Sequence, residues 1–342
     1  MIKARFDGTP ESALGEITAD QQRQIRDTLI AESEKPLTVA IMGQTGNGKS
    51  SLLNALFGAS LQVGDVRPTT KVPERVTVPG LTGHPLTFWD MPGIGESDRA
   101  DQGYLAMYRE KLITSDVVLW AMHADSRSTL FDATALDAML AGVPSGDRRA
   151  LVSRITFVLT KADLITPPPW IYVRDGDTGT FLPSKVVSQR LAEKSRYYQE
   201  ALIQPHGALQ ASETYLSDGF SIEDPRFQCD QYHVQYSGFM SAPLHDEYAR
   251  RYPQFAPVFQ RLSDNHAVIP CSAPYRYNLI RLMIAIVNKL GENAIGRFQR
   301  LIDGSEITSM VPVDRMRDYG NIVVWDKRRG AKTFDLAEVE LS

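Results

Sequence analysis

Cysteine is scarce in this sequence, and neither sign of charge dominates it. Two cysteines among 342 residues cannot form a disulfide framework, so we expect a reducing environment. The formal net charge of −4 lacks the basic footprint of proteins with broad nucleic-acid affinity. No apolar run reaches the roughly 20 residues that span a bilayer, and Lys3, Arg5 and Asp7 interrupt the apolar core that a signal peptide needs. These absences predict a soluble, cytoplasmic protein with no transmembrane segment and no strong nucleic-acid signal.

The remaining composition is typical of a folded domain, with 43% hydrophobic and 23% charged residues. Apolar strand-like runs alternate with helix-like segments over the first half of the chain. This alternation predicts an α/β fold in which helices cover both faces of a mainly parallel sheet. The expected strands span residues 37–42, 86–89, 116–122, 155–159, 267–270 and 321–325, with a hairpin at 172–181. The expected helices span 18–34, a segment that begins near residue 49, 187–202 and 279–290.

A glycine-rich phosphate-binding motif follows the first expected strand. Residues 43–50 read GQTGNGKS and match the pattern G-x-x-x-x-G-K-[ST]. Glycines let backbone N–H groups turn inward around phosphate oxygens, and the helix that follows adds the positive end of its dipole. We expect Lys49 to contact the β- and γ-phosphates and Ser50 to bind magnesium. The nucleotide-binding residues expected in this loop are Gly43, Gly46, Asn47, Gly48, Lys49, Ser50 and Ser51.

Two segments downstream supply candidate switch residues. Asp90 ends an expected strand, so its carboxylate is expected to reach magnesium through a water, while the Gly93 N–H meets the γ-phosphate. The loop between the two motifs holds Thr69 and Thr70, of which we favour Thr70 as the residue that reaches magnesium and the γ-phosphate. The expected metal ligands are Ser50, Thr70 and Asp90. The expected catalytic residues are Lys49, Thr70 and Gly93.

Base recognition is expected at two further strand ends. Asp163, in the run TKAD at 160–163, can accept hydrogen bonds from the N1–H and the 2-amino group of guanine. Adenine offers neither donor and would leave the carboxylate unpaired. The run PCSA at 270–273 places the Ala273 N–H where it is expected to meet guanine O6. The expected base-side contacts are Thr160, Lys161, Asp163, Ser272 and Ala273.

These motifs, in this order, resemble the Era-like branch of the P-loop GTPases. A narrower resemblance lies in DMPGIGES (90–97), YREKL (108–112), DVVLW (116–120) and ADSR (124–127), which are similar to putative GTPases of bacterial prophages and mobile elements. Immunity-related GTPases are more distantly similar. The resemblance covers about residues 37–161 and resumes near residue 267. It implies a three-layer P-loop GTPase domain that binds GTP or GDP and Mg²⁺ through Lys49, Ser50, Asp90, Lys161 and Asp163.

Departures from that pattern affect the expected rate of GTP hydrolysis and the expected domain organisation. Ile94 stands where Ras-type enzymes place a water-orienting glutamine, so we expect slow intrinsic hydrolysis. Thr160 replaces the asparagine that is usual in the resembling proteins. A large insertion separates the guanine-specificity motif from the last core strand, and its many aromatic residues suit either a small core of its own or a partner surface. The expected parts are an N-terminal helical extension (1–36), a GTPase domain (37–164 and 266–302), the insertion (165–265) and a C-terminal tail (303–342).

The motifs favour a GTP-hydrolysing switch whose loops order around the γ-phosphate. Two alternatives stay open: a nucleotide-gated interaction protein with negligible turnover, and a ribosome- or RNA-assembly GTPase by analogy with Era. The expected partners are GTP or GDP and an unknown protein that binds through the insertion or the switch loops. A nucleotide-dependent dimer is a further option.

Overall fold

A computed structural model gives the architecture of most of the chain. It describes residues 37–57, 74–79, 85–90, 108–127, 129–165, 170–215, 217–230, 233–287, 289, 309–313 and 322–335. The helix expected at 18–34 and the candidate residues Thr69, Thr70, Gly93 and Ile94 lie outside this part of the chain. No helix in the described ranges is both long and apolar enough to cross a membrane.

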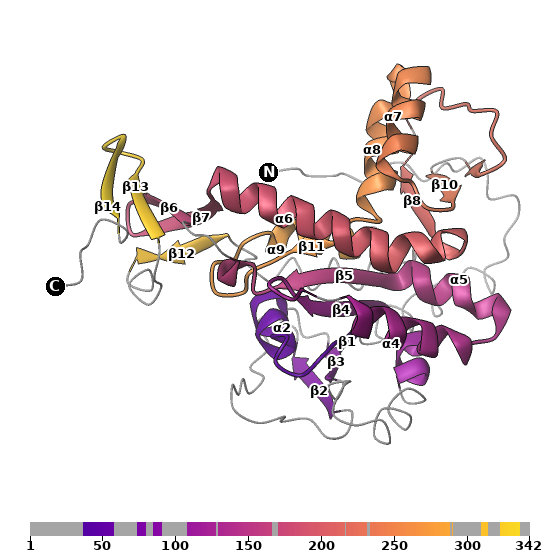
Figure 1. Cartoon of the computed structure of the whole chain (residues 1–342), viewed down its shortest axis with the longest axis horizontal. Helices are drawn as coiled ribbons and strands as arrows, with labels where there is room; N and C mark the ends of the chain where they lie inside the picture. Colours follow the sequence, from indigo (N-terminus) through magenta and orange to yellow (C-terminus); the bar gives the residue numbers. More distant parts are fainter. Residues whose placement is uncertain are drawn as a thin grey trace, which may run out of the picture.

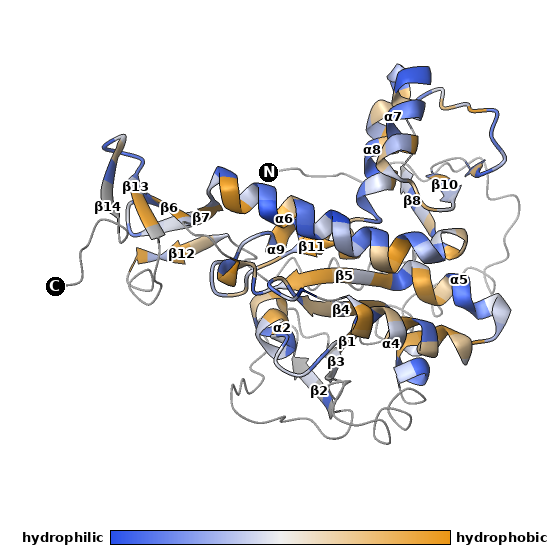
Figure 2. Cartoon of the chain, viewed as in Figure 1, coloured by the Kyte–Doolittle hydropathy of each residue, from blue (hydrophilic) through white to orange (hydrophobic). Residues whose placement is uncertain are grey.

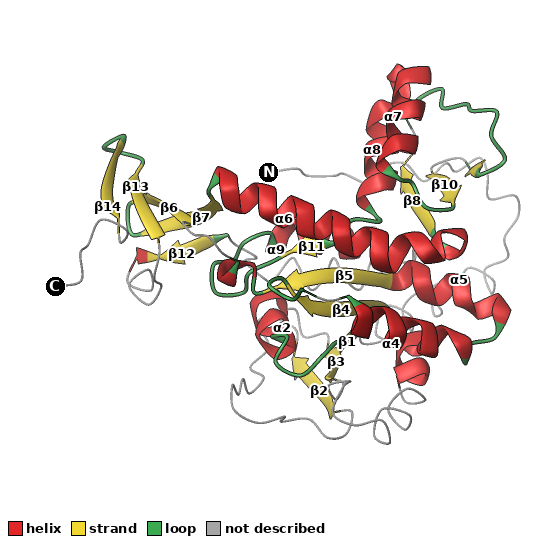
Figure 3. Ribbon diagram, viewed as in Figure 1, coloured by secondary structure: helices red, strands yellow, loops and turns green. Residues whose placement is uncertain are grey.

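The centre of the molecule is a six-stranded sheet with the strand order β11-β5-β4-β1-β3-β2 (Figures 1 and 3). Its strands are β1 (Leu37–Met42), β2 (Glu74–Pro79), β3 (Pro85–Asp90), β4 (Val117–His123), β5 (Ile155–Thr160) and β11 (Ile269–Pro270). All neighbouring strands run parallel except β2, which pairs antiparallel with β3 at one edge. The mainly parallel sheet predicted from the alternating pattern is confirmed, and β2 is an addition that the pattern did not reveal.

Helices cover both faces of this sheet and make it the middle of three layers. They are α2 (Lys49–Phe57), α4 (Leu130–Ala141), α5 (Ser145–Arg154), α6 (Lys185–Tyr198) and α9 (Leu279–Val287). Side chains alternate between the two faces of a strand, so Leu119 packs with α2 and α9 on one face while Trp120 packs with α4 and α5 on the other. Because both faces are covered, β4 and β5 are almost continuously apolar, as Figure 2 shows.

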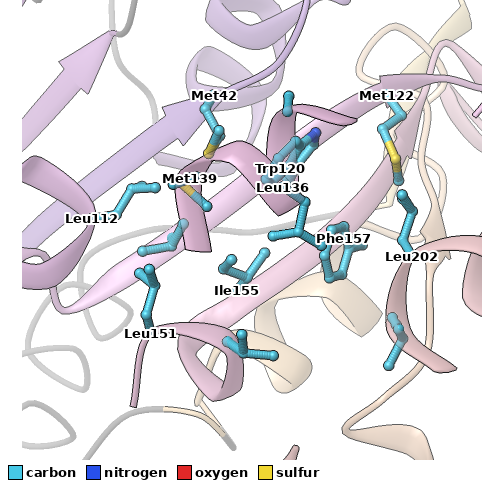
Figure 4. Packing of buried hydrophobic residues seen from close by; sticks show 14 of the residues in the cluster. Met42, Leu112, Trp120, Met122, Leu136, Met139, Leu151, Ile155, Phe157 and Leu202 are labelled. Carbon is cyan, nitrogen blue, oxygen red and sulfur yellow. The ribbon is translucent and has the colours of Figure 1, made fainter. Parts of the chain in front are cut away.

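The core on the α4 side is shown in Figure 4, where Trp120 lies beside Leu136 and Phe157. The Trp120 indole N–H donates to a carboxylate oxygen of Asp132 on α4 at 2.9 Å. Burial raises the pKa of Asp132 to about 6, although the indole hydrogen bond works in the opposite direction. The buried carboxylate therefore ties α4 to the centre of the sheet at one fixed point.

The second half of the insertion folds as a small unit with its own core. Its elements are β8 (Ala211–Tyr215), β9 (Phe227–Cys229), β10 (His233–Ser237), α7 (Ala242–Arg251) and α8 (Ala256–Asp264), and the three strands form an antiparallel sheet of order β8-β10-β9. Phe227, Tyr248 and Phe259 pack against one another inside this unit. Of the two explanations for the aromatic composition, a core within the insertion accounts for these residues.

A second sheet of five strands has the order β12-β7-β6-β13-β14. Its strands are β6 (Trp170–Asp175), β7 (Thr178–Pro183), β12 (Met310–Pro312), β13 (Ile322–Asp326) and β14 (Ala331–Asp335). The hairpin β6–β7 and the strand near 321–325 are confirmed, but their pairing was not anticipated: β13 runs parallel to β6. The second sheet thus joins a hairpin of the segment 165–265 to the tail 303–342, and the boundaries assigned to those two parts stay predictions.

Short helical segments complete the chain. They are a 3-10 turn at Ala162–Leu164, a π-helical segment at Gln199–Ile203 that continues α6, a 3-10 segment at Gln204–Leu209 and a 3-10 turn at Pro253–Phe255. The helix expected at 187–202 therefore corresponds to α6 and its continuation. Figure 1 shows α6 lying along β5, with the second sheet beyond the carboxyl end of that strand.

Candidate nucleotide-binding site

The candidate residues gather at the carboxyl edge of the six-stranded sheet because its central strands are parallel. The strand pairing aligns Ile41 with Asp90, Met42 with Trp120, and His123 with Thr160. The loops that leave β1, β4 and β5 therefore start at one edge. Asp90, the last residue of β3, lies near the same edge, level with Ile41 and two residues before the level at which the phosphate loop begins at Gly43.

Residues 43–50 form a loop that only glycine permits at its first position. Gly43 has φ +134°, and a Cβ there would lie 2.0 Å from the carbonyl oxygen of Ala121 in β4. The buried Lys49 amine donates to the carbonyl oxygens of Gly43 at 3.1 Å and Gln44 at 3.2 Å. The loop thus curls around its own ammonium group, and α2 begins directly behind it. This arrangement presents a positive charge and a helix N-terminus to one point, as an anion site requires.

Neighbouring strands hold the loop through side-chain to backbone hydrogen bonds. The Asn47 side-chain amide donates to the carbonyl oxygen of Ala121 at 2.8 Å. The Thr160 hydroxyl lies 2.6 Å from the carbonyl oxygen of Asn47 and 2.9 Å from that of Met122, so its proton serves either acceptor. The side chain of Asn47, expected on the nucleotide, therefore anchors the loop to β4. The threonine that replaces the usual asparagine performs the same kind of anchoring from β5.

The loop after β5 places its charged side chains beside the phosphate loop. Lys161 adopts the left-handed backbone conformation with φ +55°. Its Cε lies 3.5 Å from the point where a Cβ on Gly48 would stand, so the stem of the lysine runs over the phosphate loop. The Oδ1 atom of Asp163 is buried and finds no hydrogen-bond partner among the described residues. A buried acceptor without a donor is costly, and a bound base would supply donors.

The loop after β11 is joined to the loop after β5. The Ala162 N–H donates to the carbonyl oxygen of Cys271 at 3.0 Å, and the Cys271 N–H donates to that of Leu159 at 2.7 Å. Ser272, fully buried, forms a backbone bridge with Tyr277 that closes the loop. Burial raises the pKa of the Cys271 thiol far above its usual value, so this side chain is a neutral packing group. The two base-side loops therefore form one connected unit.

His123 lies at the same edge, and sequence reasoning did not single it out. Burial lowers its pKa, the charge of Lys161 lowers it further, and Asp125 and Asp163 act in the opposite direction. Its Nδ1 accepts the backbone N–H of Asp125 at 3.1 Å. The only sequence signal was its place at the end of a buried strand. The imidazole is thus a neutral group next to the base-side loop.

The structure brings together all of the described candidates and places Ser50 and Ser51 in the first turn of α2. Asp90 is placed by its backbone at the end of β3. Thr70 and Gly93 lie outside the described residues, so their roles stay predictions. Within the described ranges no three His, Cys, Asp or Glu side chains come together as a metal cluster. A metal at this edge would accordingly depend on hydroxyl and phosphate oxygens in addition to one carboxylate.

Comparison with known proteins identifies the domain. Residues 38–156 match the family model described as 50S ribosome-binding GTPase. The matched range starts in β1, includes the phosphate loop and ends in β5, so it stops before Asp163 and before the second base-side loop.

The sequence relatives cover limited parts of the chain. Uncharacterized proteins YfjP and YkfA of Escherichia coli (strain K12) are each 44% identical over 95 residues, which is 28% of this chain and 33% of each relative. The tRNA modification GTPase MnmE of Parasynechococcus marenigrum (strain WH8102) is 34% identical over 160 residues, which is 44% of this chain and 33% of MnmE. The chain therefore matches only about a third of the length of these relatives.

Solved structures also resemble the chain. Toc33 from Arabidopsis thaliana in complex with Mg²⁺ and GMPPNP superposes with a TM-score of 0.38 and 21% identity over 54% of this chain and 70% of Toc33. An Era variant from Aquifex aeolicus bound to GDP.AlF4⁻ has a TM-score of 0.38 and 18% identity over 75% of this chain and 57% of Era.

Proposed function

Because this chain carries a P-loop GTPase domain, we propose that it binds GTP and hydrolyses it to GDP and phosphate with magnesium, acting as a nucleotide-dependent switch. One observation carries the proposal beyond phosphate binding. The buried and unpartnered Oδ1 of Asp163 lies in the loop whose Lys161 stem covers Gly48. A base that donates to this carboxylate would have its phosphates in reach of the phosphate loop.

Guanine is the base that suits this carboxylate. Its N1–H and 2-amino group are two adjacent donors, and a carboxylate has two oxygens that accept them side by side. Adenine has no proton on N1 and no 2-amino group, so the buried Oδ1 of Asp163 would stay without a donor. The N–H of Ala273 in the second base-side loop would serve guanine O6, for which adenine substitutes an amino group. Ser272 beside it is held in place by its bridge to Tyr277.

Phosphate binding would use the charge of Lys49. Its ammonium is already enclosed by the carbonyl oxygens of Gly43 and Gln44, so little rearrangement is needed to place it on the β- and γ-phosphates. Charge-assisted hydrogen bonds of this kind are roughly twice as strong as neutral ones. In the transition state the same ammonium would stabilise charge on the phosphoryl oxygens.

Magnesium fits the donors at this edge, which are hard oxygen ligands. The Ser50 hydroxyl begins α2, and Asp90 ends β3 at the same edge of the sheet. Thr70 is the proposed third ligand. When bound there, the ion would neutralise negative charge on the nucleotide phosphates. Gly93 is proposed to donate its N–H to the γ-phosphate.

A low intrinsic hydrolysis rate is part of the proposal. Ile94 has no polar atom with which to orient a water, so the attacking water would have to be placed by another group or by a partner. This residue also favours the second candidate, a nucleotide-gated interaction protein with negligible turnover. The description of the matching family model favours a ribosome-assembly role as a third possibility. A protein partner, a nucleotide-dependent dimer and a cytoplasmic location complete the proposal.

Nucleotide binding and single-turnover hydrolysis of the whole chain test the proposal. We expect calorimetry with Mg²⁺ to show GDP and GTP binding far more tightly than ADP and ATP, and slow phosphate release from GTP. Lys49→Ala should reduce affinity for GTP by at least about 100-fold, because it removes charge-assisted hydrogen bonds to the phosphates. Lys185→Ala, which removes an exposed lysine of α6, is the matched control and should bind like the wild type. Equal affinity for guanine and adenine nucleotides, or full activity of Lys49→Ala, would refute the assignment.

A further inference from the structure

The two base-side loops, residues 161–165 and 271–278, are also part of the core of the second sheet. Ala162 and Ile165 from the first loop and Tyr275 from the second are buried in one apolar cluster, and Tyr277 packs against it. The other buried members of this cluster come from the second sheet and from α6. They are Trp170, Tyr172, Phe181, Val187, Leu191, Val311 and Val324. The loops that carry the guanine motifs therefore have one side toward the nucleotide site and one side in the second sheet.

Aromatic contacts define the junction. The rings of Phe181 in β7 and Tyr275 are stacked, with centroids 4.0 Å apart and an interplanar angle of 10°. Trp170 in β6 meets Tyr275 edge-on at 5.2 Å and Tyr277 edge-on at 5.0 Å. Such ring pairs stabilise a contact beyond the effect of the apolar area that they bury. The hairpin β6–β7 therefore packs against two residues of the second base-side loop, Tyr275 and Tyr277.

The C-terminal strands close the other side of the hairpin. The Tyr172 hydroxyl donates to the carbonyl oxygen of Val311 in β12 at 2.6 Å. Val324 of β13 is buried in the same cluster, and its strand pairs with β6 along five residue positions. Without these strands, the hairpin that holds Tyr275 would be a two-stranded ribbon, which is marginally stable alone.

Hydrogen bonds connect the backbone of Tyr275 to the base-recognition groups. The Tyr275 N–H donates to the Ser272 hydroxyl at 3.1 Å, and Ser272 precedes Ala273, whose N–H is proposed to meet guanine O6. The hydrogen bond from the Ala162 N–H to the Cys271 carbonyl oxygen joins this loop to the residue before Asp163. A displacement of Tyr275 would therefore move donors and acceptors on both sides of the base. The phosphate loop is held differently, by Asn47 and Thr160.

We propose that Tyr275 is the positioning residue of the guanine pocket, and that the second sheet holds it through Phe181 and Trp170. The second sheet thereby sets affinity for the base while leaving affinity for the phosphates unchanged. This inference rests on the proposed function and extends it to residues outside the nucleotide motifs. Preorganisation is the physical reason, since a loop that must be ordered on binding reduces affinity by the cost of that ordering.

The test compares GDP with pyrophosphate, each with Mg²⁺, by calorimetry on the whole chain. Pyrophosphate engages the phosphate loop and lacks a base. We expect Tyr275→Leu and Phe181→Leu to weaken GDP binding by about 10-fold, the equivalent of one lost hydrogen bond, and to leave pyrophosphate affinity within about twofold. Tyr275→Phe keeps the stacked ring and should restore GDP affinity. If Tyr275→Leu does not fold, the GDP and pyrophosphate affinities of Phe181→Leu test the inference alone.

Phe259→Leu is the matched control, because Phe259 is fully buried in the core of the insertion away from both loops. It should lower stability without changing GDP affinity. The inference is overturned if the two junction variants bind GDP like the wild type, if GDP and pyrophosphate weaken together, or if Phe259→Leu weakens GDP equally. A wild-type chain that binds pyrophosphate but not GDP would instead overturn the proposed function.

Discussion

The two halves of the candidate site are supported in different ways. The phosphate half is held by polar contacts from adjacent strands of its own sheet: Asn47 to β4, and Thr160 of β5 to Asn47. The base half is held by an apolar cluster whose members come from a distant hairpin and from the C-terminal strands. Phosphate binding is therefore encoded locally, whereas base recognition depends on long-range packing. Substitutions in the two halves should accordingly have separable effects.

The largest difference between the changes in GDP affinity and in pyrophosphate affinity is expected from Asp163→Asn. An amide in place of the carboxylate offers the guanine donors one acceptor and one opposing donor, so the affinity for GDP should fall by at least about 100-fold. Pyrophosphate affinity should be unchanged, because Lys49 and the phosphate loop remain intact. Xanthosine diphosphate, which carries an oxygen in place of the 2-amino group, should bind the variant more tightly than GDP does. Unaltered GDP affinity measured by calorimetry would remove Asp163 from the site.

A smaller effect, without selectivity between GDP and pyrophosphate, is expected from Thr160→Val. Valine keeps the shape of threonine but removes the hydroxyl proton that the carbonyl oxygens of Asn47 and Met122 share. We expect GDP and pyrophosphate affinities to fall together by roughly 5–10-fold, and the free energy of unfolding to fall by about 1–3 kcal/mol. Thr160→Ser retains the hydroxyl and serves as the control. A loss confined to GDP would contradict the division into two halves.

A third prediction concerns acid stability outside both base-side loops, just before the start of β11. Burial lowers the pKa of His266 to about 3, with Lys289 contributing, and its Nε2 has no hydrogen-bond partner among the described residues. Because the pKa is near 6.5 in the unfolded chain, acid protonates the unfolded state first. His266 therefore costs stability as the pH falls below about 6.5, and the loss between pH 7 and pH 5 is about 2 kcal/mol.

This prediction is checked by urea unfolding of the wild type and of His266→Gln at both pH values. Between pH 7 and pH 5, the free energy of unfolding of the wild type should fall by about 2 kcal/mol more than that of the variant. Titrating groups that do not interact with His266, including Asp132, contribute to both proteins and cancel in the difference. Lys289, whose pKa burial lowers to about 7, interacts with His266 and therefore contributes to the shift. A difference that does not change with pH would show that His266 is protonated alike in both states.

Motifs confined to one strand and one turn were predictable from the sequence. The phosphate loop, the strand ends at Asp90 and Thr160, and the mainly parallel sheet follow from local patterns of glycine, charge and apolar runs. The helices α4 and α5 escaped notice, as did the individual strands and helices between residues 211 and 264, although a core within the insertion was one of the two explanations for its aromatic residues. The sequences of α4 and α5 have no clear apolar period, and tertiary packing stabilises these helices.

The second sheet was the least predictable part, because its pairing depends on contacts between distant residues. No local signal relates Trp170 to Ile322, although the two are aligned in neighbouring strands. Trp325 is 42% exposed, whereas the adjacent Val324 is buried in the core of the second sheet. Successive side chains of a strand point to opposite faces of its sheet, so the strand pairing determines which of the two residues is buried. His123 and Tyr275 were missed for the same reason, since their roles depend on neighbours from other segments.

A crystal structure of the whole chain with GDP and Mg²⁺ is the most direct test of the central claim. The account predicts the guanine N1–H and 2-amino group on the Asp163 carboxylate, the β-phosphate on the Lys49 amine, and the Tyr275 ring still stacked on Phe181. A nucleotide bound elsewhere, or an Asp163 side chain turned away from the base in the occupied site, would contradict it.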